Sequence, residues 1–179
     1  YGPGHPHRAN VTNFLGIMHF NAGRYEQARQ HWAQSLEIVR AVHGPEHLNV
    51  AHYLSNLAAA YGRLGQRDQQ MQMLEDALRI IEANHSPTHR DVGQMCSLIG
   101  QLHLEAGERE QARPWLERAI DILEAAGAKE TLVQAKSSLG MALLESEPQQ
   151  ACALIDGAYL LREDPAVTHP PAAVVVLAA

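Results

Sequence analysis

Histidine is the residue of this chain whose chemistry could be most distinctive, because imidazole is a common ligand of transition metals. The chain has 11 histidines, and three of them, at positions 5, 47 and 89, recur every 42 residues. Such a period places them on successive structural units, too far apart to share an ion bound at about 2 Å per ligand. His43 and His47 are four residues apart, but the Gly-Pro between them breaks the helix that would align them. The sequence therefore predicts no metal site.

Carboxylates are the next candidates, because paired acidic groups can act as general acid and base. Glu105, Glu108 and Glu110 gather at one predicted turn, where charged helix ends are commonly solvated and unreactive. We expect His19 and His103 to pack against neighbouring helices. The sequence has no phosphate-binding loop, nucleophile elbow or Cys-x-x-Cys motif. We therefore predict no catalytic residue, no cofactor and no enzymatic activity in this chain, although a longer parent protein could carry an enzymatic domain.

The composition of the chain indicates which partners it can bind and in which compartment it is expected. With a formal net charge of −6 and no run of Lys or Arg, the chain lacks the basic face that nucleic acids require. The longest apolar run, 172–179, is far shorter than the roughly 20 residues of a membrane-spanning helix. Cys96 and Cys152 fall within predicted helices, and we expect both to be buried packing residues in a reducing compartment. We predict a cytoplasmic protein that binds neither nucleic acid nor membrane.

A repeated unit of 42 residues must position all of these groups. The tetrapeptide at 2–5 recurs at 44–47 and at 86–89 with proline always second, and glycine recurs at 23, 65 and 107. A fixed period in this range is typical of a solenoid, in which each unit buries its apolar face against its neighbours. With 46% hydrophobic but only 5% aromatic residues, the composition favours closely packed helices.

Each unit is predicted to contain two helices. The first three pairs are expected at 7–22 and 25–42, 49–64 and 67–84, and 91–106 and 109–126, with a shorter pair at 130–145 and 148–162. The predicted organisation is a linker at 1–6 from a preceding, missing repeat, units at 7–47, 48–89, 90–128 and 129–163, and a poorly ordered tail at 164–179. We therefore expect the chain to be a piece of a longer protein.

Apolar residues hold equivalent positions and should form the core. Examples are Leu15, Leu57 and Ile99 on the first helix of each unit, and Trp32, Leu74 and Leu116 on the second. Small residues recur where two helices should approach closely. They are Gly16, Ala58, Gly100 and Gly140 on the first helices, with Ala28, Ala112, Ser35, Ala77 and Ala119 on the second.

The ends of the predicted helices carry their own signals. The glycines at 23, 65 and 107 should end the first helix of each unit in a left-handed conformation, and the prolines at 45 and 87 should stop the second. Thr88 and Asp91 have capping-box spacing, and Ser146 with Pro148 suits the start of the last helix. Pro114 should remove a backbone hydrogen bond, which a kink or a late helix start would absorb.

This repeat resembles the tetratricopeptide repeat, in the 42-residue variety seen in kinesin light chains and in bacterial signalling proteins. Gln70 departs from the pattern, which wants alanine there, so the second helix pair should pack more loosely. The fourth unit is short and suits an end cap. The match lies in Leu15-Gly16, His19, Gly23-Arg24-Tyr25, Ala28, Trp32 and Gly44-Pro45-Glu46-His47, in Leu57-Ala58, Tyr61, Gly65, Leu74 and Ala77, and in Ile99-Gly100, His103, Gly107, Ala112, Leu116 and Ala119.

The resemblance implies an all-α, right-handed superhelical solenoid of antiparallel helix pairs, with the first helix of each pair lining a concave groove. An amide-rich lining could hydrogen-bond the backbone of an extended peptide. The groove residues would be Asn10, Asn13 and Ile17, then His52, Ser55, Asn56, Ala59 and Arg63, then Gln94, Ser97 and Gln101, and finally Gln134, Ser137 and Met141. A hydrated helix face with no ligand is the alternative interpretation.

Some tetratricopeptide adaptors clamp a C-terminal carboxylate with Lys, Asn and Arg, but among the matching positions here only Asn56 fits. A carboxylate clamp for chaperone tails is therefore not expected. The sequence favours a scaffold or adaptor that binds a peptide or partner protein. Two other roles stay open: a regulatory or sensory segment of a larger bacterial signalling enzyme, a Ser/Thr kinase or NTPase-type regulator that it docks on, and a spacer that stacks on itself.

Overall fold

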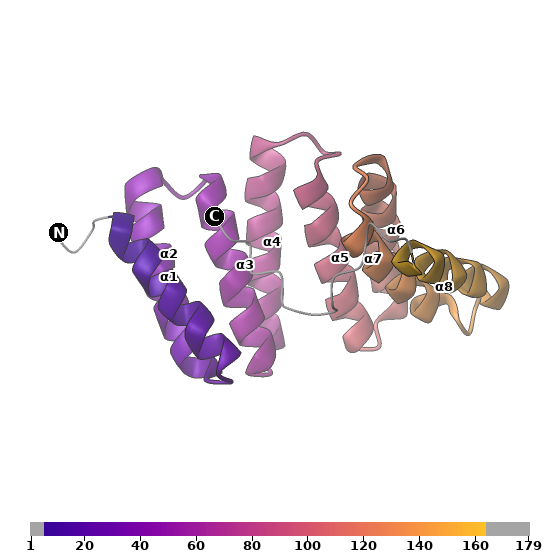
Figure 1. The fold of residues 1–179 in the computed structure, drawn as a ribbon, viewed down its shortest axis with the longest axis horizontal. Helices are drawn as coiled ribbons and strands as arrows, with labels where there is room; N and C mark the ends of the chain where they lie inside the picture. The colour runs from indigo at the N-terminus through magenta and orange to yellow at the C-terminus, as the bar shows by residue number, and fades with distance from the viewer. Residues whose placement is uncertain (1–5, 164–179) are drawn as a thin grey trace. The chain divides into compact units, whose positions relative to one another are not determined.

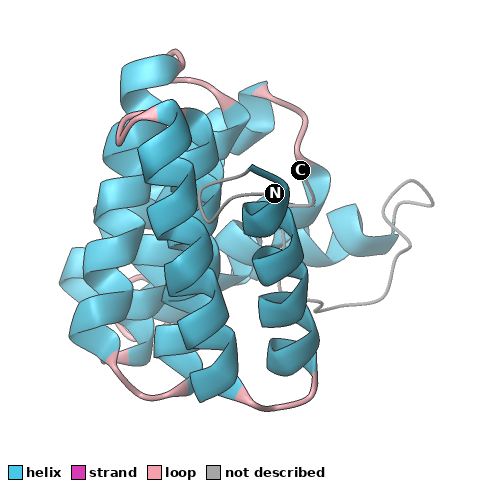
Figure 2. Cartoon of the chain, turned by 90° about the vertical axis from the view of Figure 1, so that its left-hand side faces the viewer, coloured by secondary structure: helices cyan, strands magenta, loops and turns pink. Residues whose placement is uncertain are grey.

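The computed structural model describes residues 6–163, and all regular structure in that range is helical (Figures 1 and 2). This confirms the predicted all-α repeat fold. The predicted helices also agree with the structure, the largest difference being the end of α7 at Leu143 instead of 145. The predicted tail at 164–179 lies outside the described residues. The helices are α1 (Pro6–Asn21), α2 (Tyr25–His43), α3 (Leu48–Arg63), α4 (Arg67–Asn84), α5 (Arg90–Glu105), α6 (Arg109–Ala125), α7 (Lys129–Leu143) and α8 (Pro148–Glu163).

The helices form two compact units, one containing α1 to α4 and the other α5 to α8. In the first unit α1 packs on α2, α2 on α3, and α3 on α4. In the second unit α5 packs on α6, α6 on α7, and α7 on α8, and α5 also contacts α7. We call α1, α3, α5 and α7 the A helices and the other four the B helices.

Glycine ends the first three A helices, as predicted. Gly23, Gly65 and Gly107 have φ angles of 73°, 71° and 76°, in the left-handed region that other residues rarely adopt. At the first of these turns the amide of Gly23 donates to Phe20 and the amide of Arg24 donates to His19, each at 2.9 Å. These bonds satisfy carbonyls at the helix end, so the chain reverses and the next B helix can start two residues later.

Close helix approach is visible where small and large residues face each other. A Cβ on Gly16 would lie 2.4 Å from Nε1 of Trp32, and a Cβ on Gly100 would lie 2.6 Å from Cγ of Leu116. Trp32 and Leu116 are both fully buried, so neither has free space to move into. The predicted role of the small residues in A–B packing is therefore confirmed at these positions.

The amide side chain of Gln70, which departs from the repeat pattern, lies against Gly62. A Cβ on Gly62 would come within 2.7 Å of Nε2 of Gln70. In the preceding and following repeats the corresponding pairs are Phe20 with an alanine and Leu104 with an alanine. In those repeats the larger residue is on the A helix, whereas here it is on the B helix. Glycine at position 62 therefore leaves room for the side chain of Gln70 at a position where the other repeats have alanine.

Two local predictions were wrong, and one of the two alternatives given for Pro114 is excluded. The cap of α5 is His89, whose Nδ1 accepts from the amide of Asp91 at 3.3 Å, whereas the Thr88 hydroxyl lies 3.2 Å from that of Ser86. A histidine one residue later thus replaces the predicted capping box. The late start proposed for the helix containing Pro114 is also absent, because α6 begins at Arg109 and continues through the proline. The Ser146 hydroxyl donates to Leu143 at the end of α7 and does not cap α8.

Two outer faces are exposed where burial was predicted. Leu15 is 38% exposed, while its repeat equivalents Leu57 and Ile99 are almost fully buried. Cys96 is buried, as predicted, but Cys152 on α8 is exposed, and the two cysteines form no disulfide within the described residues. The reason is the same at both places: within the described chain no further helix covers the outer face of α1 or of α8.

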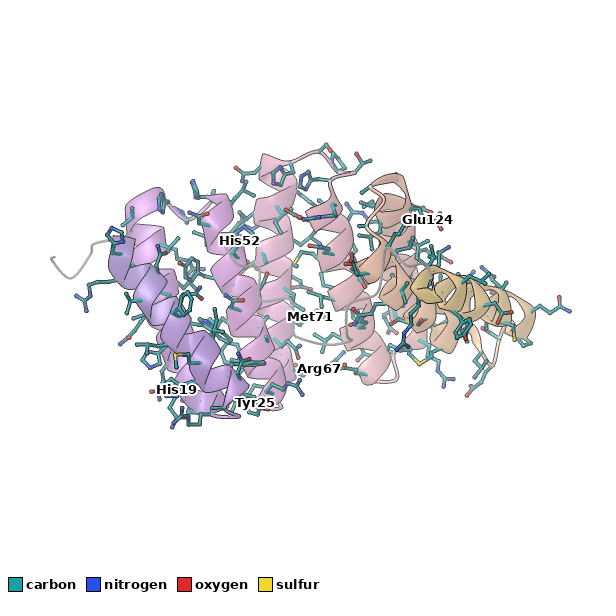
Figure 3. The ribbon with its side chains drawn as sticks, in the orientation of Figure 1. His19, Tyr25, His52, Arg67, Met71 and Glu124 are labelled. Carbon is teal, nitrogen blue, oxygen red and sulfur yellow. The ribbon has the colours of Figure 1, made fainter. Side chains whose placement is uncertain are left out.

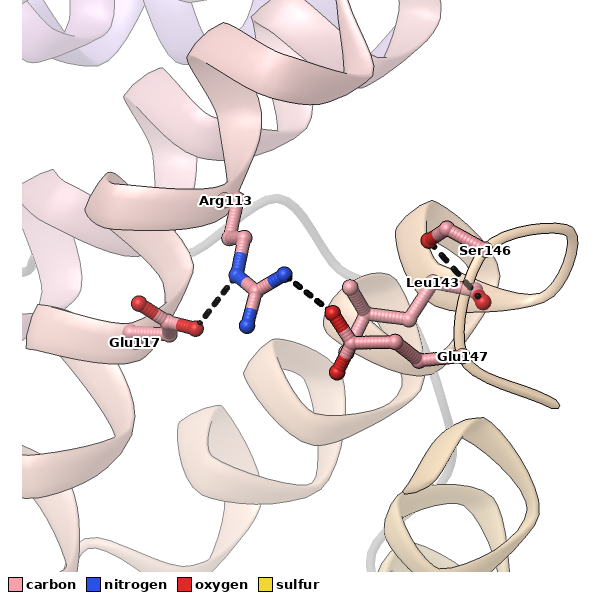
Figure 4. Close-up of polar contacts among 5 residues, drawn as sticks. All are labelled: Arg113, Glu117, Leu143, Ser146 and Glu147. Carbon is pink, nitrogen blue, oxygen red and sulfur yellow. Dashed lines mark hydrogen bonds and ion pairs between the residues drawn. The ribbon is translucent and has the colours of Figure 1, made fainter. Parts of the chain in front are cut away.

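An arginine on α6 ties the last helix pair to the third one (Figure 4). Nε of Arg113 donates to Glu117 at 2.7 Å, and its NH1 donates to Glu147, in the turn before α8, at 2.5 Å. The hydrogen bonds to Glu147 and Glu117 raise the pKa of the guanidinium above its ordinary value. Because the side chains are partly solvated, we assign this pair a role in orientation rather than a large stabilisation.

Candidate functional site

The predicted groove residues all lie on A helices, the helices that the family resemblance assigns to the groove. In the first unit Asn10 and Arg63 are exposed, whereas Asn13, Ile17, His52 and Ser55 are half-buried. In the second unit Gln134 is exposed, and Gln94, Gln101 and Ser137 are half-buried. Asn56 and Ser97 differ from the others because they are buried, with only 7% and 1% of their surface exposed to solvent.

Amide side chains link neighbouring A helices in the first unit. Nδ2 of Asn56 donates to Oδ1 of Asn13 at 3.2 Å, and one turn away the Tyr53 hydroxyl donates to Oδ1 of Asn10 at 3.4 Å. Within the described chain the Asn13 amide nitrogen and the Asn56 carbonyl oxygen make no further hydrogen bond. The pair therefore keeps one donor group and one acceptor, which is what a single peptide unit of a ligand can satisfy.

A second amide pair joins α5 and α7 in the second unit. Nε2 of Gln134 donates to Oε1 of Gln101 at 3.2 Å. Nε2 of Gln101 and Oγ of Ser97, four residues apart on α5, are buried without a hydrogen-bond partner in the described residues. Unpaired buried polar atoms are unfavourable by about 1–3 kcal/mol each, so this stretch of α5 is one where a new hydrogen bond would be gained.

The sequence did not reveal a small pocket in the first unit. It has a volume of about 160 Å³ and is lined by apolar residues of α2 and by polar groups from α1 and α3. Because Asn10 and Tyr53 belong both to the pocket lining and to the hydrogen-bonded contacts between α1 and α3, the pocket adjoins the predicted site. Its full lining is Ala9, Asn10, Ile38, Val39, Val42, His43, Asn49 and Tyr53.

His19 on α1 and His31 on α2 form a pair of stacked imidazoles between the two helices (Figure 3 labels His19). The rings of His19 and His31 are 5.1 Å apart and inclined by 14°, and the Nδ1 atom of each ring is buried without a partner among the described residues. Partial burial, and then the nearby charges of Arg24 and His31, lower the pKa of His19 below its ordinary value. The equivalent His103 instead contacts a carboxylate, with its Nδ1 2.7 Å from Glu108.

Acidification should therefore destabilise the first unit. Because the pKa of His19 is lower in the folded chain, the unfolded chain binds its proton first as the pH falls through about 6.5. The contribution of His19 to stability is complete above that pH and is lost as the pH falls towards the folded pKa. We expect a lower melting temperature at about pH 5.5 than at about pH 7.5, measured by circular dichroism. The variant His19→Tyr, which copies Tyr61 of the next repeat, should show a smaller difference. An unchanged difference would assign the effect to other groups.

No helix in the range 6–163 is long and apolar enough to cross a membrane. No curated protein sequence matches the chain. Two family profiles do match, both described as "Tetratricopeptide repeat", one over residues 7–82 and the other over residues 93–122. Repeats of this family generally mediate protein–protein interaction, and they are typically non-catalytic.

Similar solved structures share the fold at low sequence identity. BtubC (BKLC) from P. vanneervenii is 21% identical with a TM-score of 0.80, over 92% of this chain and 67% of that one. A putative kinesin light chain from Podosopora anserina, with nearly identical TPR-like repeats, is 20% identical with a TM-score of 0.75, over 93% and 79%. Aspartyl phosphate phosphatase F from Bacillus subtilis is 16% identical with a TM-score of 0.81, over 91% of this chain but only 42% of its own.

Proposed function

We propose that this chain, which belongs to the tetratricopeptide repeat family, binds an extended peptide segment of a partner protein on its A-helix faces. The amide pairs between neighbouring A helices are the observation that carries the proposal. In the first unit, the pair of Asn13 and Asn56 keeps an amide nitrogen and a carbonyl oxygen available. A peptide in extended conformation presents one N–H and one C=O per residue, so it matches this pattern without requiring a particular side chain.

The second unit has a similar pair of hydrogen-bonded amides, in which the unpaired group is buried. Gln101 accepts from Gln134, and its Nε2 is buried without a partner in the described residues, so a rotation of the side chain that exposes this group would let it donate to a peptide carbonyl. The small pocket beside Asn10 would take a side chain of the bound segment, with apolar contact to α2 and a polar rim. Affinity would then come mainly from backbone hydrogen bonds, and selectivity from such pockets.

Replacing Asn13, Asn56 and Gln101 together with alanine should weaken peptide binding without unfolding the chain. Each replacement removes a hydrogen-bonding group of about 0.5–1.5 kcal/mol, so the combined loss should be roughly tenfold or more in Kd. We would select ligands from a random peptide display library on the wild-type protein. Fluorescence polarisation would then compare the affinity of the selected peptides for each variant.

A matched triple variant controls for surface changes. Gln34, Gln72 and Gln111 are exposed amides on the B helices, and their replacement by alanine should leave both affinity and helicity unchanged. A selected peptide that is indifferent to the A-helix variant would contradict the proposal. A peptide weakened equally by both triple variants would also contradict it.

An alternative function rests on the outer face of α1. Val11, Phe14 and Met18 are all more than half exposed and share one face of the helix with Leu15. Such an apolar face suits docking against a further domain, as in a regulatory segment of a larger bacterial kinase or NTPase-type regulator. Loss of partner binding in Phe14→Ser, with full binding by the A-helix triple variant, would favour this role over peptide binding.

A further inference from the structure

The loop before α5 brings two imidazoles and a carboxylate together. The rings of His85 and His89 stack with centroids 3.8 Å apart and planes inclined by 8°. Nδ1 of His89 lies 3.6 Å from Oδ2 of Asp91, and one possible ligand atom from each of the three residues lies within 4.8 Å of the others. All three side chains are half-buried. Helical spacing could not predict this cluster, because His85 belongs to the loop and only Asp91 lies within α5.

The preceding repeat contains the equivalent loop, with a different residue at the position of Asp91. His43 and His47 correspond to His85 and His89, and their rings are also stacked, with centroids 4.7 Å apart. Both His47 and His89 accept a hydrogen bond at Nδ1 from the amide two residues later. The residue that carries this amide differs in charge, because Asn49 stands where the second loop has Asp91. The first loop also has a carboxylate, Glu46, but its Oε2 lies 2.6 Å from the guanidinium of Arg79. Among the described residues only the second loop gathers a carboxylate oxygen with its two imidazoles.

We propose that His85, His89 and Asp91 form a binding site for a divalent transition ion of the zinc class. Two imidazole nitrogens and one carboxylate oxygen are a donor set that zinc accepts, with water in the fourth position. Bonds of about 2.0–2.2 Å at tetrahedral angles place neighbouring ligand atoms roughly 3.4 Å apart. The separation of 3.6 Å between Nδ1 of His89 and Oδ2 of Asp91 is close to that edge.

The ion competes with local contacts that are weak. The lone pair on Nδ1 of His89 faces the amide of Asp91 at 3.3 Å, a longer contact than the 3.1 Å between His47 and the amide of Asn49. Nε of Arg90 lies 3.8 Å from Oδ1 of Asp91, which leaves Oδ2 for the ion. The two stacked rings must tilt apart so that one nitrogen of each points at a common centre.

Calorimetric titration of the full chain with Zn²⁺, after tag removal and EDTA treatment, tests the site. We expect one saturable equivalent in the wild type. Asp91→Asn, which copies the first loop, and His85→Ala should each weaken binding by about tenfold or more, because loss of a ligand should exceed the 10–100-fold effects of ligand-supporting residues. Circular dichroism should show unchanged helicity. Equal Zn²⁺ affinity in these variants, or no saturable binding in the wild type, would overturn the proposal.

The first loop supplies a gain-of-function test. Asn49→Asp gives His43 and His47 a carboxylate at the position that Asp91 holds in the second loop, so the titration should show two equivalents of Zn²⁺ instead of one. The imidazole ¹⁵N resonances of His43 and His47 should then shift on titration in this variant and stay fixed in the wild type. A stoichiometry that remains at one would contradict our inference that the carboxylate completes the site.

Discussion

Replacing Trp32 with alanine is expected to lower the free energy of unfolding of the first unit by about 3–5 kcal/mol, the range for truncating a large buried aromatic residue. Trp32 has no exposed surface, and its indole fills the space over Gly16 between α1 and α2. Its ring also packs at 5.4 Å from that of Phe20. The backbone of α1 cannot close the resulting cavity fully, since its approach is set by other contacts as well. Urea denaturation followed by circular dichroism measures the loss.

The second tryptophan provides a control with the same change in chemistry. Trp115 on α6 is half-buried, so Trp115→Ala removes less surface from contact with the protein. We expect this variant to lose clearly less stability than Trp32→Ala. Equal losses would mean that the position of Trp32 in the core does not determine its contribution. Because neighbouring repeats can unfold separately, the comparison should use the transition of each unit where two are resolved.

The repeat period explains why the helices could be predicted from the sequence. A period of 42 residues aligns glycine, proline and apolar positions several times over, so an error in one repeat is corrected by the others. Burial followed the pattern only where a neighbouring helix exists. Leu57 and Ile99 are buried, but Leu15 is exposed, although the three residues are equivalent in the sequence. A local pattern thus identifies an apolar face, whereas its burial depends on what packs against it.

At the candidate site, too, the sequence identified the helices involved but not the contacts of their side chains. The resemblance to the tetratricopeptide repeat, rather than the helix period, assigned the amides of the A helices to a groove, and that assignment stays a prediction. The sequence could not show that Asn56 and Ser97 are buried, or that Asn56 donates to Asn13. A small rotation of one helix about its axis would change both the burial and the hydrogen bond. The histidine cluster was missed for another reason: the spacing of four residues between His43 and His47 was dismissed because no helix aligns them, whereas in the equivalent loop the rings of His85 and His89 stack without a helix.

Replacing Gly100 with valine should destabilise the second unit by about 3 kcal/mol, at the upper end of the range for overpacking. The first added carbon would lie 2.6 Å from Cγ of Leu116 and 3.3 Å from the carbonyl oxygen of Ala112. Leu116 is fully buried and branched at Cγ, so α5 and α6 must move apart or Leu116 must leave its preferred rotamer. Replacing a glycine inside a helix also improves helix propensity, but this stabilises the unit by no more than about 1 kcal/mol.

Gly157 on α8 separates the packing effect from the change in helix propensity. A Cβ added to Gly157 would have Nζ of Lys136 as its nearest neighbour, at 4.0 Å, so a side chain at this position meets open space. Gly157→Val should therefore change stability by less than about 0.5 kcal/mol, because valine and glycine differ only modestly as helix formers. Thermal and urea unfolding of both variants give the comparison. If Gly100→Val is as mild as Gly157→Val, then glycine at position 100 is not required for the close approach of α5 to α6, and the equivalent small residues of the other repeats would lose the same explanation.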